Sequence, residues 1–264
     1  MCRNLMLMGR RLLKVAGPIF VTVAAILVAS CAAQQTREKT FASPGQASQA
    51  LYDAVRHDDA DEVQAILGAT PEVVSPDKEE DEGKLERQRF VEKYQEMHRL
   101  VREPDGFTVL YVGAENWPFP IPLVQAGNRW QFDSGSGANE ILARRIGENE
   151  TLAIHVCQAI SKANAPDANA AAADGAIVAF AQNLAKPDTA KAPSESFHGY
   201  YFQRLGVQLA GVVVVAYPAN YRASGVKTFI VAGGEVYEKD LGPQTALVAQ
   251  NIKGNYVENW NRVQ

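Results

Sequence analysis

Prolines occupy every second position in the segment Trp117-Pro118-Phe119-Pro120-Ile121-Pro122-Leu123. Proline has no backbone N–H, and successive residues of a strand alternate between its two sides. A strand built from this segment could pair along one side only, so it is predicted to be an edge strand. The apolar residues between the prolines are predicted to form one continuous face on a core: Trp117, Phe119, Ile121 and Leu123.

Helix signals precede this segment, and a strand partner follows it. Ser43 and Gln46 flank Pro44 in a capping box, and Asp59 opens a second short helix that Gly68 ends. A third predicted helix carries a looser apolar stripe of Leu85, Phe90, Tyr94, Met97 and Val101. Gly127-Asn128 is a turn sequence into a hairpin partner, residues 129–133. We expect the α+β class, with N-terminal helices packed on an antiparallel hairpin sheet that resembles the cystatin-like cone.

The second half of the chain changes from helix patterns to strand patterns. Apolar residues at helical spacing predict a long linking helix through residues 136–160, capped by Ser136 and with a break or a kink at Gly147. The alanine-rich stretch that follows is predicted to be a linker with one short helix. A C-terminal antiparallel β-meander with a Gly233-Gly234 turn is predicted from four strand patterns: residues 198–205, 212–217, 226–232 and 235–239.

These patterns divide the chain into five predicted segments. They are a signal peptide (1–30), a lipidated tether (31–40), an N-terminal α+β domain (41–162), the Ala-rich linker with its helix (163–195) and a C-terminal β-rich domain (196–264). The chain from Cys31 onward is long enough for one large domain or two small ones.

The N-terminal segment predicts export. The first thirty residues carry four basic side chains and no acidic one, and Val15 to Val28 is an apolar stretch shorter than the ~20 residues that span a bilayer. Its end, Leu27-Val28-Ala29-Ser30-Cys31, resembles the lipobox of bacterial lipoproteins, in which the cysteine thiol receives a diacylglycerol. We therefore expect cleavage before Cys31 and lipidation of that residue. The alternative is cleavage after Ala33, which would release a soluble periplasmic protein.

Net charge and cysteine content limit which partners and cross-links the chain can have. Four of the 26 basic residues precede Cys31, which leaves 22 basic against 30 acidic residues and a net charge of −8. A negative surface argues against nucleic acid as a partner. With Cys31 acylated, Cys157 has no disulfide partner and is predicted to be a buried apolar residue. By resemblance to lipoproteins of enteric-type bacteria, the absence of Asp after Cys31 favours an anchor in the outer membrane, facing the periplasm.

A polar group is predicted on the long helix: Arg144, Arg145, Asn149 and Glu150. Arg145 and Asn149 lie one helical turn apart, so one interpretation is a clamp for a carboxylate or another anion. His198, beside two tyrosines, is a further candidate ligand-binding residue. The other interpretation is that the polar group pairs with acids such as Asp133 and holds the helix on the sheet. No catalytic residue, metal or cofactor is predicted, because metal-ligand spacings and nucleophile motifs are missing.

Several short motifs together resemble a known bacterial family. In the first half they are the segment 117–123, Trp130-Gln131-Phe132-Asp133, Glu140-Ile141-Leu142, Arg144-Arg145-Ile146-Gly147 and Asn149-Glu150. In the second half they are His198-Gly199-Tyr200-Tyr201-Phe202, Ala216-Tyr217-Pro218, Ser224-Gly225-Val226, Thr228-Phe229-Ile230-Val231, Val236-Tyr237 and Lys239-Asp240-Leu241-Gly242-Pro243. Over Phe41 to Ala249 the chain resembles the family called domain of unknown function 2950, with a shorter middle around Asp174 to Lys186. The resemblance implies an envelope protein and no particular chemistry.

Two functions stay open on the sequence alone. The first is an uncharacterised lipid-anchored cell-envelope protein that acts as a non-catalytic binding or assembly module. Its partners would be the membrane and another envelope protein, since its C-terminal strands resemble the globular end of some pilins. The second is an enzyme that acts on a small ligand in a cone-shaped pocket through Arg145, Glu150 or His198. A deep pocket with one of these residues at a displaced pKa would favour the second function.

Overall fold

The computed structural model describes residues 38–68, 80–163, 175–186, 196–208, 211–252 and 257–264. Within these residues it contains six helices and two antiparallel sheets, which confirms the predicted α+β class. The predicted signal peptide and most of the predicted tether lie outside the described residues.

The first helices begin and end where the sequence supplies caps. The Ser43 hydroxyl and the Asp59 carboxylate each accept a hydrogen bond from a backbone N–H in the first turn, and Gly68 ends the second helix with φ 79°. These bonds satisfy N–H groups that have no partner inside the helix. The three helices are α1 (Pro44–Arg56), α2 (Ala60–Leu67) and α3 (Glu80–Glu96).

The first sheet has the strand order β1-β2-β4-β5, and β3 also pairs with β2. Its strands are β1 (His98–Arg102), β2 (Thr108–Val112), β3 (Trp117–Pro118), β4 (Leu123–Ala126) and β5 (Arg129–Phe132). The only strand that pairs with β3 among the described residues is β2, as expected of the proline segment. However, β4 lies between β2 and β5, so the predicted edge is wrong at Leu123, which pairs on both sides. After Pro122 every residue again carries an N–H, and the chain can pair on both sides.

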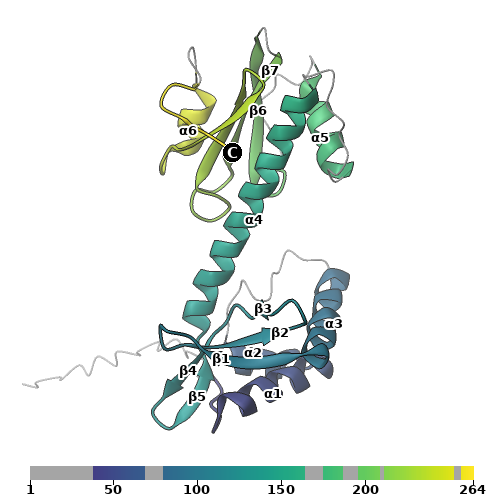
Figure 1. Ribbon diagram of the computed structural model, residues 1–264, viewed down its shortest axis with the longest axis vertical. Coiled ribbons are helices and arrows are strands. Elements are labelled where there is room, and N and C mark those ends of the chain that lie inside the picture. Colours follow the sequence, from purple (N-terminus) through teal and green to yellow (C-terminus); the bar gives the residue numbers. More distant parts are fainter. Residues whose placement is uncertain (1–37, 69–79, 164–174, 187–195, 209–210, 253–256) are drawn as a thin grey trace, which may run out of the picture. The chain divides into compact units, whose positions relative to one another are not determined.

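The helices α1, α2 and α3 lie along this sheet (Figure 1) and cover its apolar residues. Ile121, Leu123 and Phe132 are fully buried in a core shared with Leu51 of α1 and Ile66 of α2. The predicted apolar face is therefore confirmed at Ile121 and Leu123. It is wrong at the first residue, since the Trp117 side chain is 43% exposed.

Residues 98–102 form β1 and not the last turn of α3. Val101 continues the helical spacing of the apolar stripe, yet the helix ends at Glu96 and the next residues pair antiparallel with β2. The connecting turn contains Pro104, Asp105 and Gly106, and the glycine has φ 93°. This turn sequence favours a hairpin. Val101 follows Met97 at helical spacing by chance, because a stripe of a few apolar residues does not distinguish a helix from the start of a strand.

One helix of 30 residues, α4 (Ser134–Ala163), follows the first sheet. Its N-cap is Asp133 and not the predicted Ser136, because the Asp133 carboxylate accepts hydrogen bonds from the Ser136 N–H at 3.1 Å and from its hydroxyl at 2.8 Å. The helix continues through Gly147, so the predicted break is wrong. A single glycine costs a helix only about 1 kcal/mol, and the packing on both sides of Gly147 offsets that cost.

The second sheet is a five-stranded meander in the order β10-β9-β8-β7-β6, as predicted. Helices α4 and α5 lie on one face of this sheet and α6 on the other (Figure 1). Val214 packs in the core that contains residues of α4 and α5, and Val215 packs in the core that contains Ala249 of α6, so β7 is buried on both faces. Gly233 and Gly234 both have positive φ in the turn between β8 and β9. The elements of this part are α5 (Gly175–Ala185), β6 (Tyr200–Gln208), β7 (Gly211–Pro218), β8 (Lys227–Ala232), β9 (Glu235–Asp240), α6 (Thr245–Gln250) and β10 (Asn261–Arg262).

Candidate functional site

Arg144 joins α4 to the proline segment. Its Nη1 donates a hydrogen bond to the Pro118 carbonyl at 2.9 Å, and its Nε donates to Glu140 at 2.8 Å. The guanidinium carbon lies 5.1 Å from the centre of the Trp117 ring, within the range of a cation–π contact. Asp133, the acid proposed as a partner for this polar group, caps the helix instead.

Asn149 and Glu150 hold α4 on the second sheet. Oε1 of Glu150 accepts hydrogen bonds from the N–H of Val226 at 2.8 Å and from that of Lys227 at 3.0 Å. Nδ2 of Asn149 donates to the Ser224 carbonyl at 2.9 Å. Hydrogen bonds to an ionised carboxylate are about twice as strong as neutral ones, so Glu150 is the main polar anchor of the segment that enters β8.

Two glycines allow the segments around this anchor to approach closely. A Cβ atom on Gly199 would lie 2.7 Å from Nδ2 of Asn149, and one on Gly225 would lie 2.1 Å from the Tyr200 hydroxyl. That hydroxyl donates to the Lys227 carbonyl at 2.8 Å. Burial, and then the charge of nearby Glu150, raise the pKa of Tyr200 above its ordinary value, so Tyr200 stays a neutral donor. The α4 docking joint is defined here as Asn149, Glu150, Gly199, Tyr200 and residues 224–227.

His198 forms the first corner of a tight turn beside this joint. Phe197 and Tyr200 exchange backbone hydrogen bonds of 2.8 and 3.1 Å, while His198 and Gly199 have φ values of 46° and 72°. Two successive positive φ values are typical of a type I′ turn. The imidazole is exposed and lies edge-on to the Phe197 ring, with 4.5 Å between ring centres. Turn geometry therefore accounts for the position of His198.

Arg145 differs from its neighbours on α4. It is exposed, and no hydrogen bond or ion pair joins it to another residue in the described ranges. Asn149, its partner in the hypothesis of an anion clamp, donates its amide to Ser224. The structure thus brings Asn149 and Glu150 to one place and leaves Arg145 outside the docking joint.

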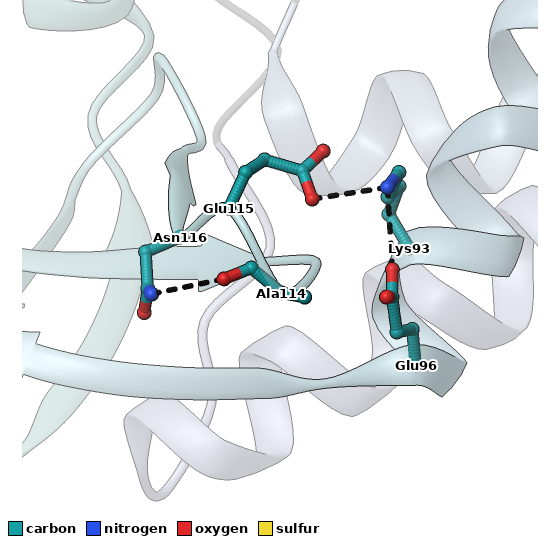
Figure 2. A network of polar contacts seen from close by, with 5 residues as sticks. All are labelled: Lys93, Glu96, Ala114, Glu115 and Asn116. Carbon is teal, nitrogen blue, oxygen red and sulfur yellow. Dashed lines mark hydrogen bonds and ion pairs between the residues drawn. The ribbon is translucent and has the colours of Figure 1, made fainter.

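A second polar network, which sequence reasoning missed, ties the β2–β3 turn to the end of α3 (Figure 2). Nζ of Lys93 contacts Glu115 at 3.0 Å and Glu96 at 3.2 Å, and the Gly113 N–H donates to the Lys93 carbonyl. Hydrogen bonds from the ammonium to Glu115 and Glu96 raise the pKa of Lys93. A backbone hydrogen bond and then Lys93 lower the pKa of Glu115. These side chains are exposed, so the network is a surface cap on a helix end.

Other chemistry-bearing groups lie elsewhere. In the part of the chain that the structure describes, no three or more His, Cys, Asp or Glu side chains are placed to hold a metal ion. Nor is any described helix long and apolar enough to cross a bilayer. Cys157 is fully buried, as predicted, and burial raises the pKa of its thiol to about 12. Cys31, the predicted lipidation site, lies outside the described residues.

Comparison with protein families decides the assignment. The family described as protein of unknown function (DUF2950) matches residues 38–192 and 185–263. The chain belongs to this family. The DUF2950 match spans both sheets and all of α4, and it confirms the resemblance inferred from the motifs. No curated protein and no solved structure matches the chain, so the likeness to a cystatin-like cone stays a prediction.

The DUF2950 motifs quoted from the sequence converge on the contacts of α4. Asn149-Glu150, His198-Gly199-Tyr200 and Ser224-Gly225-Val226 together supply most of the α4 docking joint. The proline segment and Arg144 meet at the Pro118 carbonyl. These motifs are far apart in sequence, but all of them hold α4. One group attaches α4 to the proline segment, and the other attaches it to the segment that enters β8.

Proposed function

We propose that this DUF2950 protein is a lipid-anchored component of the bacterial cell envelope and that its folded part is a non-catalytic binding or assembly module. The observation that carries the proposal is the sequence from Leu27 to Cys31, which ends an apolar stretch after a basic start. In that context the cysteine thiol is the acyl acceptor. The outer membrane, on its periplasmic side, is the proposed location, and another envelope protein is the proposed partner.

The contacts of the polar residues support a module over an enzyme. A general acid, base or nucleophile needs a side chain that can reach a substrate. Glu150 and Asn149 instead bond to backbone groups before β8, and Arg144 bonds to the Pro118 carbonyl. Each of these residues positions one segment of the chain on another, which is the role of a structural polar contact.

Metabolic labelling with palmitate tests the anchor. The wild-type protein is expected to incorporate the label, and Cys31→Ser is expected to lose it, because serine offers no thiol for the acyl glycerol. Cys2→Ser is the matched control, since Cys2 lies in the segment that is removed. Labelling of Cys31→Ser at the wild-type level would contradict the proposal, as would an intact mass that places the mature N-terminus at Gln34.

A further inference from the structure

The first described residue is bonded to the body of the fold. Oε2 of Glu38 accepts a hydrogen bond from the Gln131 side chain at 3.1 Å, and Oε1 accepts one from the Ser134 N–H at 3.3 Å. The Ser134 hydroxyl also donates to this carboxylate. A carboxylate at the start of α4 is favourable, since the N-terminus of a helix carries partial positive charge.

The next three residues continue this attachment. The Lys39 N–H donates to the Ala65 carbonyl at 2.8 Å. Phe41 and Trp130 exchange two backbone hydrogen bonds of 2.7 and 2.8 Å, so this segment extends the sheet beyond β5. Nη2 of Arg129 donates to the Thr40 carbonyl. The fold therefore holds the chain from Glu38 onward.

Chain length then limits how far the fold can lie from an acyl group on Cys31. Only six residues, 32–37, separate Cys31 from Glu38. A chain advances by at most about 3.6 Å per residue, so the two Cα atoms lie no more than about 25 Å apart. The polar headgroup layer alone is about 5–8 Å thick on each side of the bilayer core. The remaining length of a fully extended chain, about 17–20 Å, is the most that can separate Glu38 from the headgroup surface.

We propose that the anchored protein rests its β4–β5 hairpin, residues 123–132, on lipid headgroups, with the short chain after Cys31 supplying the contact. This inference rests on the lipid anchor of the proposed function. Three residues of the hairpin bond to residues 38–41: Arg129, Trp130 and Gln131. Residues 38–41 also bond to α2 through Ala65 and to the start of α4 through Ser134.

The side chains of the hairpin fit a headgroup surface. Arg129 is its only charged residue, in a chain with a net charge of −8 after Cys31. Its exposed tip consists of Gln125, Ala126, Gly127 and Asn128, which are small or neutral. Carboxylates that would be repelled by anionic lipid are absent from residues 123–132, while the basic side chain of Arg129, next to the tip, is favoured near such a surface.

Energy transfer from tryptophan to a dansyl group on phosphatidylethanolamine tests the inference. The full acylated chain is placed in vesicles as a single-tryptophan protein that retains Trp130, with Trp117→Phe and Trp260→Phe. Strong transfer from Trp130 is expected. A second protein carries 40 Gly/Ser residues inserted between Gln35 and Thr36, which raises the mean span of the connection to roughly 38 Å. We expect the insertion to abolish the transfer.

A single-tryptophan protein that retains Trp117 is the matched control. The Trp117 ring lies beside Arg144, which comes ten residues after Ser134 in α4. At roughly 1.5 Å per residue, Arg144 is about 15 Å along the helix axis from Ser134, the residue that bonds to Glu38. The transfer from Trp117 should be weaker than that from Trp130. Equal transfer from both residues, or transfer that survives the insertion, would overturn the inference.

The mass of the same sample separates the two proposals. An acylated protein without transfer from Trp130 would overturn the hairpin contact and leave the lipid anchor intact. A protein without acyl chains would remove the anchor, and the contact with it.

Discussion

Glu150 accepts two backbone hydrogen bonds, and its replacement measures what the α4 docking joint contributes. Glu150→Ala leaves the N–H groups of Val226 and Lys227 without their acceptor. A hydrogen bond to a charged group contributes about 1.5–3 kcal/mol, so the free energy of unfolding is expected to fall by roughly 3 kcal/mol. Urea denaturation followed by circular dichroism gives this value.

Glu148→Ala is the control for charge. Glu148 is exposed and lies two residues before Glu150 on the same helix, so the two variants lose the same charge. A surface substitution of this kind changes stability by no more than about 0.5 kcal/mol. If both variants lost equal stability, the net charge of α4 and not the docking joint would be responsible.

Cys157 makes stability depend on alkaline pH. Burial raises the pKa of its thiol from 9.0 to about 12 in the folded protein. As pH rises above 9, the unfolded chain loses this proton first, so stability is full below pH 9 and falls toward pH 12, by at most about 1.4 kcal/mol per pH unit. Cys157→Ala should therefore lose less stability than the wild type between pH 8 and about pH 11. Identical pH profiles in chemical denaturation would contradict this prediction.

Two glycines in different elements should respond to the same change with opposite signs. Gly147 lies within α4, where an added Cβ would meet nothing within 4 Å. Gly147→Ala is therefore expected to raise the free energy of unfolding by about 0.5–1 kcal/mol. Gly225→Ala places a methyl group 2.1 Å from the Tyr200 hydroxyl, and overpacking of this kind costs about 1–3 kcal/mol.

Thermal unfolding monitored by circular dichroism compares the two glycine variants. The melting temperature should rise for Gly147→Ala and fall for Gly225→Ala. A lower melting temperature for Gly147→Ala would contradict this prediction. It would show that the backbone of α4 needs the conformational freedom of glycine at that position.

Features that depend on neighbouring residues could be predicted from the sequence, while features that depend on partners distant in the chain could not. The caps at Ser43 and Asp59 and the Gly233-Gly234 turn depend on a few adjacent residues, and the structure confirms them. The exposure of Trp117 depends on how far the helices extend over the sheet. The alternation of residues along a strand carries no information about that. Asn149 and Glu150 were recognisable as a polar pair, but the partners of Glu150 begin 76 residues later in the chain. Their role as an anchor needed the structure.

In the part of the chain that the structure describes, buried residues form two sets, one for each sheet. One set lies between the first sheet and helices α1 to α3, and includes Ile66 and Phe132. The other lies on both faces of the second sheet, and includes Ile160 of α4 together with Phe229 and Ile230. Because each set has its own sheet, and α4 is the helix that contacts both sets through Ile141 and Ile160, each can in principle lose its packing while the other keeps it.

Unfolding should therefore be resolved into two transitions with separate responses to mutation. Ile66→Ala and Ile230→Ala each remove a fully buried side chain, which costs about 2–5 kcal/mol. Trp130 reports on the first core and Trp260 on the second, since each ring packs against one of them. In urea, Ile66→Ala should lower the midpoint seen by Trp130 and spare the midpoint seen by Trp260, while Ile230→Ala should do the reverse. Equal shifts of both midpoints in either variant would mean that α4 couples the two cores into one cooperative unit, and the contacts of Arg144 and Glu150 would then be the first places to look for that coupling.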